Sequence, residues 1–116
     1  MSVNDADSLP SVFITHAASV LGDTNEGLTG SGIIKFFSGY AIEFNVDIPF
    51  AASLAGVPNK RTALNENLNA FSAKQQYKII RELCEFERFK DNPKVKDLKI
   101  KLISRYSQFA GADAAA

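Results

Sequence analysis

The stretch SAKQQYKIIRELCEF, residues 72–86, decides the fold because it joins a helix start to a one-sided apolar pattern. Ser72 and Gln75 have the spacing of a capping box, in which each side chain accepts a hydrogen bond from the other residue's backbone N–H. One arc of the helical wheel then holds Ile79, Ile80, Leu83, Cys84 and Phe86, and the other holds Lys78, Arg81, Glu82 and Glu85. The stretch predicts an amphipathic helix whose apolar face packs against other helices.

Helical patterns flank this stretch on both sides. Upstream, Leu64, Leu68 and Phe71 share one face of a helix that we expect to begin near Lys60. Downstream, Asn92 is suited to cap a last helix with Pro93 in its first position. The apolar residues of that helix recur at helical spacing and are Val95, Leu98, Leu102, Tyr106 and Phe109. We therefore expect three consecutive helices in the C-terminal half.

The N-terminal half adds two helices and one segment of a different period. Ser8 is the expected N-cap of a helix that ends at Gly22. Its expected core residues are Leu9, Val12, Phe13, Ala17, Val20 and Leu21. Thr29 is the expected cap of a shorter helix that Gly39 ends. Residues 42–50, IEFNVDIPF, alternate between apolar and polar, which predicts an extended segment, either an edge strand or a piece laid across the helices.

Together these elements predict an all-α fold, a compact bundle of about five helices with one extended segment at about residues 42–50. The length of 116 residues fits one domain, which we assign to residues 8–110, between a disordered N-terminus (1–7) and a flexible tail (111–116). The polar, acidic start and the lack of a run of 18 apolar residues predict a cytoplasmic protein with no membrane segment. The single cysteine excludes a disulfide framework within the chain.

Reactive side chains are scarce, so we expect no enzymatic activity, no metal and no cofactor. His16 is the only histidine, which excludes a site built on several histidines of this chain, and we expect it to be a buried or half-buried structural residue. Cys84 lies on the apolar arc of its helix and is expected in the core. The glycines of residues 27–32 resemble a phosphate-binding loop, but neither the GK[ST] motif nor a preceding strand is present, so we expect a capped turn.

The charges divide between the two halves of the chain. Residues 1–58 carry one base and six acids, a net charge of −5, whereas residues 59–116 carry twelve bases and seven acids, a net charge of +5. Such a split can neutralise itself within one molecule, attract a second copy, or present a basic face to an acidic partner. The candidate interaction residues are Lys94, Lys99, Lys101, Arg105, Lys60, Arg61, Glu26, Glu43 and Asp47.

Two segments carry a family resemblance. LGDTNEGLTGSGIIKFF (residues 21–37) and NKRTALNENLNAF (residues 59–71), followed by a helical remainder, resemble the helical N-terminal domains of bacterial abortive-infection proteins of the AbiJ type. The resemblance covers residues 8–107 and implies a domain that senses, recruits or oligomerises beside an effector, often a HEPN ribonuclease, in phage defence. Gly32 departs from the family pattern, which has an acidic residue there, and thereby removes a capping box with Thr29.

From these observations we expect a non-enzymatic protein-interaction or oligomerisation module, a sensor or adaptor of a bacterial antiphage system. Its expected partner is a protein or an effector domain in the same full-length chain or a separate one, and a homo-oligomer is possible. The alternative is a small nucleic-acid-binding protein that uses the basic last helix, although an overall pI near 6.6 is low for that class.

Overall fold

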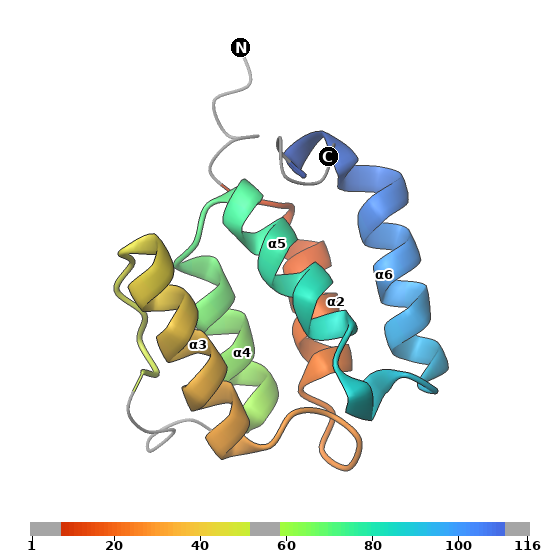
Figure 1. Ribbon diagram of the computed structural model, residues 1–116, viewed down its shortest axis with the longest axis horizontal. Coiled ribbons are helices and arrows are strands. Elements are labelled where there is room, and N and C mark those ends of the chain that lie inside the picture. Colours follow the sequence, from red (N-terminus) through yellow and green to blue (C-terminus); the bar gives the residue numbers. More distant parts are fainter. Residues whose placement is uncertain (1–7, 52–58, 111–116) are drawn as a thin grey trace.

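The computed structural model describes residues 8–51 and 59–110 and shows an all-α fold (Figure 1). In these residues five α-helices and two short 3-10 helices follow one another: α2 (Ser11–Leu21), α3 (Gly30–Phe44), α4 (Lys60–Asn69), α5 (Ala73–Cys84), η1 (Glu87–Phe89), α6 (Pro93–Tyr106) and η2 (Ser107–Phe109). The predicted bundle of five helices is confirmed. The termini predicted to be disordered or flexible, residues 1–7 and 111–116, lie outside the described residues.

Four helices begin at a polar side chain that accepts hydrogen bonds from the first turn. Ser72 and Gln75 form the predicted capping box at α5, and Asn92 caps α6 with Pro93 at its first position. Thr29 Oγ1 accepts a bond of 3.0 Å from the N–H of Gly32 at the start of α3. The side chain of Asn59 likewise accepts a hydrogen bond from the N–H of Thr62, so α4 begins at Lys60 as expected. Each cap satisfies backbone donors that have no partner within the helix.

The predicted cap of α2 is wrong. The N-cap is Pro10, which offers no side-chain hydrogen bond, and Ser8 lies before the helix, where its Oγ donates to the carbonyl of Leu9. Gly22 is the C-cap, as predicted. Val12, predicted for the core, is 81% exposed. The buried stripe of α2 instead includes Ile14 and Ala18, because the helix presents the side opposite Val12 to its neighbours.

Helix α3 is longer than predicted. Gly39 does not end it but lies within it, on the exposed side. A glycine inside a helix costs some stability, and the burial of Phe37 on the opposite side of the helix offsets this cost. The helix ends at Asn45, whose N–H donates to the carbonyls of Ala41 and Ile42, and its left-handed backbone (φ 55°) brings the N–H of Val46 to the carbonyl of Ala41 at 2.9 Å. The start of the predicted extended segment, Ile42–Phe44, is therefore helical, and Ile42 is 83% exposed.

Residues 46–48 have no regular secondary structure and are followed by a turn at residues 49–50, so the predicted extended segment forms no strand among the described residues. Val46, Ile48 and Phe50 are half-buried while Asp47 and Pro49 are exposed, as the alternation predicts for this part. The buried side chain of Asn67 accepts from the N–H of Phe50 at 2.9 Å and donates to its carbonyl at 3.2 Å. This pair of bonds holds the segment against α4.

Helix α2 lies near the centre of the bundle, where α4, α5 and α6 pack against it (Figure 1). Helix α3 packs on α4, and α6 packs on α5. The fully buried side chains come from both halves of the chain and include Ile14, Leu21, Phe37, Leu64, Leu68, Ile79, Leu83, Leu98 and Leu102. The core therefore forms only when the acidic and basic halves of the sequence fold together.

A buried glutamine ties the beginning of the described chain to this core. Gln76 Oε1 accepts from the N–H of Leu9 at 2.7 Å, and its Nε2 donates to the carbonyl of Leu68 at 2.9 Å and to Ser8 Oγ at 3.2 Å. Both polar ends of a fully buried side chain are satisfied in this way, which removes most of the cost of burying it. Gln76 thus fixes the chain before α2 against α4 and α5.

Candidate functional site

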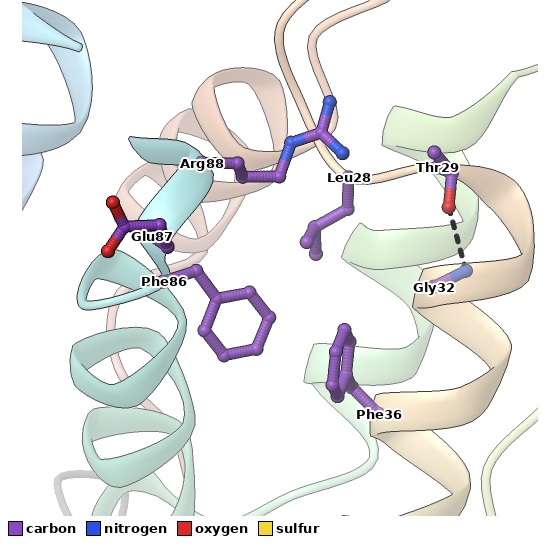
Figure 2. Close-up of a pocket in the computed structure, with 7 residues that line it drawn as sticks. All are labelled: Leu28, Thr29, Gly32, Phe36, Phe86, Glu87 and Arg88. Carbon is purple, nitrogen blue, oxygen red and sulfur yellow. Dashed lines mark hydrogen bonds between the residues drawn. The ribbon is translucent and has the colours of Figure 1, made fainter. Parts of the chain in front are cut away.

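An open cavity of about 340 Å³ lies between the start of α3 and the turn that follows α5 (Figure 2). Its lining residues are Leu28, Thr29, Gly32, Phe36, Phe86, Glu87 and Arg88. None of them belongs to the surface predicted from the charges. The lining comes from two segments 50 or more residues apart in sequence, so different local structure shapes each wall.

The first wall is the loop before α3 and the first turn of that helix. The backbone of the loop folds tightly: Leu28 donates to the carbonyl of Leu21 at 2.7 Å, and Gly27 to that of Asp23 at 3.0 Å. A Cβ at Gly27 would lie 2.3 Å from the backbone nitrogen of Asp23, so only glycine fits there. Leu28 is consequently fixed and buried, and it forms the floor of the cavity.

Hydrogen bonds to a carboxylate hold the same loop. Asp23 Oδ2 accepts from the N–H groups of Glu26 (3.0 Å) and Asn25 (3.1 Å), which hold the pKa of this carboxyl below its usual value, and the charges of Lys94 and Arg61 lower it further. These bonds stabilise the loop before α3. Thr29, its last residue, caps the helix and leaves Gly32 facing the cavity (Figure 2).

The second wall forms where α5 ends. Phe86 leaves the helix with an extended backbone (φ −61°, ψ 143°) before η1 begins, and Phe89 anchors that short helix in the core. The ring of Phe86 thereby meets the ring of Phe36, with centroids 4.5 Å apart in an edge-to-face arrangement. Both rings are only half-buried. Together they give the cavity an aromatic wall with unfilled surface.

The two charged residues at the rim differ in their surroundings. Glu87 Oε2 lies 3.1 Å from Lys90 Nζ, so this carboxylate already has a cation beside it. Arg88 has neither an ion pair nor a hydrogen bond within the described part of the chain. Figure 2 shows its side chain extending from η1 towards the loop that carries Leu28 and Thr29. An exposed cation therefore stands at the rim of an apolar cavity.

A second, more polar cavity of about 380 Å³ adjoins the first. Glu87 and Arg88 line both of them, and the remaining lining residues of the second are Glu26, Lys90, Asp91, Asn92 and Pro93. Asn92 Nδ2 donates to Glu26 Oε1 at 3.4 Å across this cavity. Because both are lined by Glu87 and Arg88, the apolar and the polar cavity are neighbours beside η1.

The nine candidate interaction residues do not form one surface. Near the loop of residues 22–29 lie Lys94 and Arg61, whose charges act on Asp23, together with Glu26 and Lys60, the latter donating to the carbonyl of Thr24 at 3.3 Å. Glu43 and Asp47 lie at the opposite end of α3. The remaining three, Lys99, Lys101 and Arg105, lie along α6.

Several of these charges already have partners. Lys99 pairs with Glu85, Lys101 with Asp97 at 2.9 Å, and Glu43 with Lys78 at 2.8 Å. The Glu43–Lys78 pair joins the acidic half of the sequence to the basic half within one molecule. The basic face of α6 is thus partly neutralised by its own neighbours, which lowers its attraction for a polyanion.

The two reactive side chains singled out in the sequence lie in different surroundings. His16 is exposed, which corrects the expectation of a buried or half-buried residue, because it lies on the same outward side of α2 as Val12. Cys84 is buried as predicted, and burial raises the pKa of its thiol to about 12. Burial and a hydrogen bond to Glu82 also raise the pKa of Tyr40 above its usual value.

Over residues 8–51 and 59–110, no three His, Cys, Asp or Glu side chains are grouped so that they could hold a metal ion. No helix within those ranges combines the length and the apolar character needed to cross a membrane.

Sequence reasoning missed the cavity because its two walls meet only in the folded chain. One local signal was present at Gly32. A glycine in the first turn of a helix leaves space beside the residue one turn later, here Phe36, and a Cβ at Gly32 would lie 3.8 Å from that ring.

No protein-family model matches the chain, and no curated protein or solved structure shows significant similarity to it.

Proposed function

We propose that the chain is a non-enzymatic protein-interaction and oligomerisation module, a sensor or adaptor of a bacterial antiphage abortive-infection system. It acts with an effector in the same full-length chain or in a separate one. The observation that carries the proposal is the open apolar cavity between α3 and η1, with its aromatic wall and Arg88 at its rim. The defence role is drawn from the resemblance of residues 21–37 and 59–71 to AbiJ-type domains.

A cavity of this kind supports the binding of a protein. Interfaces obtain most of their affinity from a few side chains that fill apolar pockets, and aromatic and arginine residues are enriched at these positions. The half-buried rings of Phe36 and Phe86 supply apolar area, and the charged side chain of Arg88 can orient a bound partner. Exposed Ile100 and Ile103 on α6 add apolar surface of the sort found at interfaces.

A phage challenge tests this function. Bacteria that carry the locus encoding the chain are compared with bacteria in which the chain has the substitution Arg88→Glu. The control is Arg81→Glu, which makes the same charge change at an exposed position of α5 that lines neither cavity. We expect phage to plate on the Arg88→Glu strain as efficiently as on cells without the chain, while the Arg81→Glu strain stays protected. Full protection by the Arg88→Glu strain would contradict the proposal.

One observation favours the alternative function, nucleic-acid binding. Lys94, Lys101 and Arg105 are spaced by seven and four residues and so share one side of α6. A filter-binding series with duplex DNA and with RNA over increasing salt tests it, comparing the wild type with the triple variant Lys94→Glu, Lys101→Glu, Arg105→Glu. Salt-dependent retention that the triple variant loses would support this alternative. Absence of retention at low salt would eliminate it.

A further inference from the structure

We infer that the cavity between α3 and η1 binds a short peptide segment of a partner protein in which a bulky apolar residue stands next to an acidic one. The apolar side chain enters the cavity and the carboxylate pairs with Arg88. This inference rests on the proposed function as an interaction module and specifies what the module recognises.

The apolar residue of the proposed peptide is inferred from the side chains that line the cavity. The floor is Leu28, and the rings of Phe36 and Phe86 stand at the side with surface still unfilled. A third ring or a branched aliphatic chain gains both burial and favourable ring geometry there. The volume of about 340 Å³ lies near the lower limit of small-ligand sites, which run from about 300 to 1,000 Å³. The cavity is therefore suited to one large side chain.

The acidic residue of the proposed peptide is inferred from the charged side chains at the rim of the cavity. Glu87 already pairs with Lys90, although both side chains are exposed, whereas Arg88 has no partner in the described residues, and a planar guanidinium binds a carboxylate through two parallel hydrogen bonds. Lys35 Nζ, 5.9 Å from the ring centroid of Phe36, adds a second cation near the same wall. The first turn of α3 contains no acidic residue, so no carboxylate of the helix itself offsets its positive end.

A segment of polypeptide fits better than a free small molecule because the site continues beyond Arg88. The polar cavity along Glu26, Asp91 and Asn92 adjoins the apolar one through Glu87 and Arg88. A chain whose anchor residue occupies the first cavity can place its following residues in the second. Its polar backbone then lies among side chains that can accept and donate hydrogen bonds.

The test uses the whole chain, labelled with ¹⁵N, and three acetylated and amidated tetrapeptides: Gly-Phe-Asp-Gly, Gly-Phe-Asn-Gly and Gly-Ala-Asp-Gly. Amide shifts are followed during each titration. We expect saturable shifts at Leu28, Gly32 and Arg88 with the Phe-Asp peptide. We also expect about fivefold weaker binding of the Phe-Asn peptide, equivalent to about 1 kcal/mol, and no saturation with the Ala-Asp peptide.

Variants assign the charge preference to one residue. In Arg88→Gln the Phe-Asp and Phe-Asn peptides should bind equally, whereas in the control Arg81→Gln the fivefold preference should persist. Equal binding of the two peptides by the wild type, or a preference retained in Arg88→Gln, overturns the inference. Absence of saturable shifts with all three peptides also overturns it, but leaves the phage-challenge result as separate evidence for or against the interaction module.

Discussion

Gln76 is the residue whose replacement has the most predictable local consequence. Its side chain binds Leu9 N–H and the carbonyl of Leu68 in a fully buried position. Gln76→Leu leaves the N–H of Leu9 buried without a partner, at about 1–3 kcal/mol, whereas the carbonyl of Leu68 still accepts from the N–H of Phe71 at 3.1 Å. We expect urea denaturation to show a loss of free energy of unfolding in that range or above. The control Lys74→Ala, exposed on the same helix, should be nearly neutral. Unchanged stability of Gln76→Leu would mean that the chain before α2 is not held there.

Leu83 and Leu98 test the buried faces of α5 and α6. Both are fully buried, so Leu83→Ala and Leu98→Ala should each lower the free energy of unfolding by about 2–5 kcal/mol. Lys101→Ala removes only a partly exposed ion pair with Asp97 and should change the free energy of unfolding by less than about 1 kcal/mol. Thermal unfolding of the three variants measures these differences. Equal melting temperatures would contradict the assignment of faces.

Cys84 gives a chemical test of the same core. The thiolate is the form that attacks iodoacetamide, and burial raises the pKa of the Cys84 thiol to about 12. At pH 8.5 the native thiol therefore stays protonated as well as covered. We expect mass spectrometry to show slow alkylation in buffer and rapid alkylation in denaturing urea. Rapid alkylation of the native protein would show that α5 opens readily at its C-terminal end.

At the scale of elements, the first turn of α3 links stability to the cavity. Thr29→Ala removes the cap of Gly32 N–H and should cost about 1 kcal/mol. Gly32→Glu replaces a helical glycine and allows a capping box, so we expect it to stabilise the protein by about 1 kcal/mol. Its Cβ would lie 3.0 Å from Thr29 Oγ1, which requires a small shift of that side chain. Chemical denaturation measures both changes, and a destabilised Gly32→Glu protein would show that the shift is not tolerated.

The elements also show how far the sequence could predict this molecule. The starts of α4, α5 and α6 were predictable because their caps and apolar faces are local signals. The end of α3 was not, since the helical continuation past Gly39 depends on packing of Phe37 and Phe44 against Phe71. Tertiary packing outweighs the weak preference of a single glycine. The cavity was hidden for a similar reason: Phe36 and Phe86 stand 50 residues apart and become neighbours only through the bundle.

At the scale of the whole molecule, two acids and two bases of the candidate interaction residues lie at opposite ends. Glu43 and Asp47 lie at one end of α3, and Lys60 and Arg61 lie at the start of α4 near the other end (Figure 1). Both acids are exposed, but Glu43 pairs with Lys78, whereas Asp47 has no ion pair among the described residues. A head-to-tail contact between these ends would repeat from copy to copy. Clustering of this kind raises the local concentration of an attached effector.

Sedimentation velocity over a range of concentrations tests this association. We expect self-association in about 0.01 M salt that disappears in about 1 M salt, since the screening length falls from about 30 Å to about 3 Å. Arg61→Glu should weaken it, whereas Arg81→Glu should not. A monomer at every concentration and salt level would eliminate self-association and leave recruitment of a separate partner as the function of the module.

The central position of α2 has a consequence for how the chain is made. This helix is the first of the described elements to leave the ribosome, yet the helices that cover it, α4, α5 and α6, are synthesised afterwards. Its apolar stripe has no native surface to cover it until most of the chain has emerged. Folding therefore follows synthesis of nearly the whole domain rather than accompanying it. During translation the nascent N-terminal half is the part most exposed to chaperones and proteases.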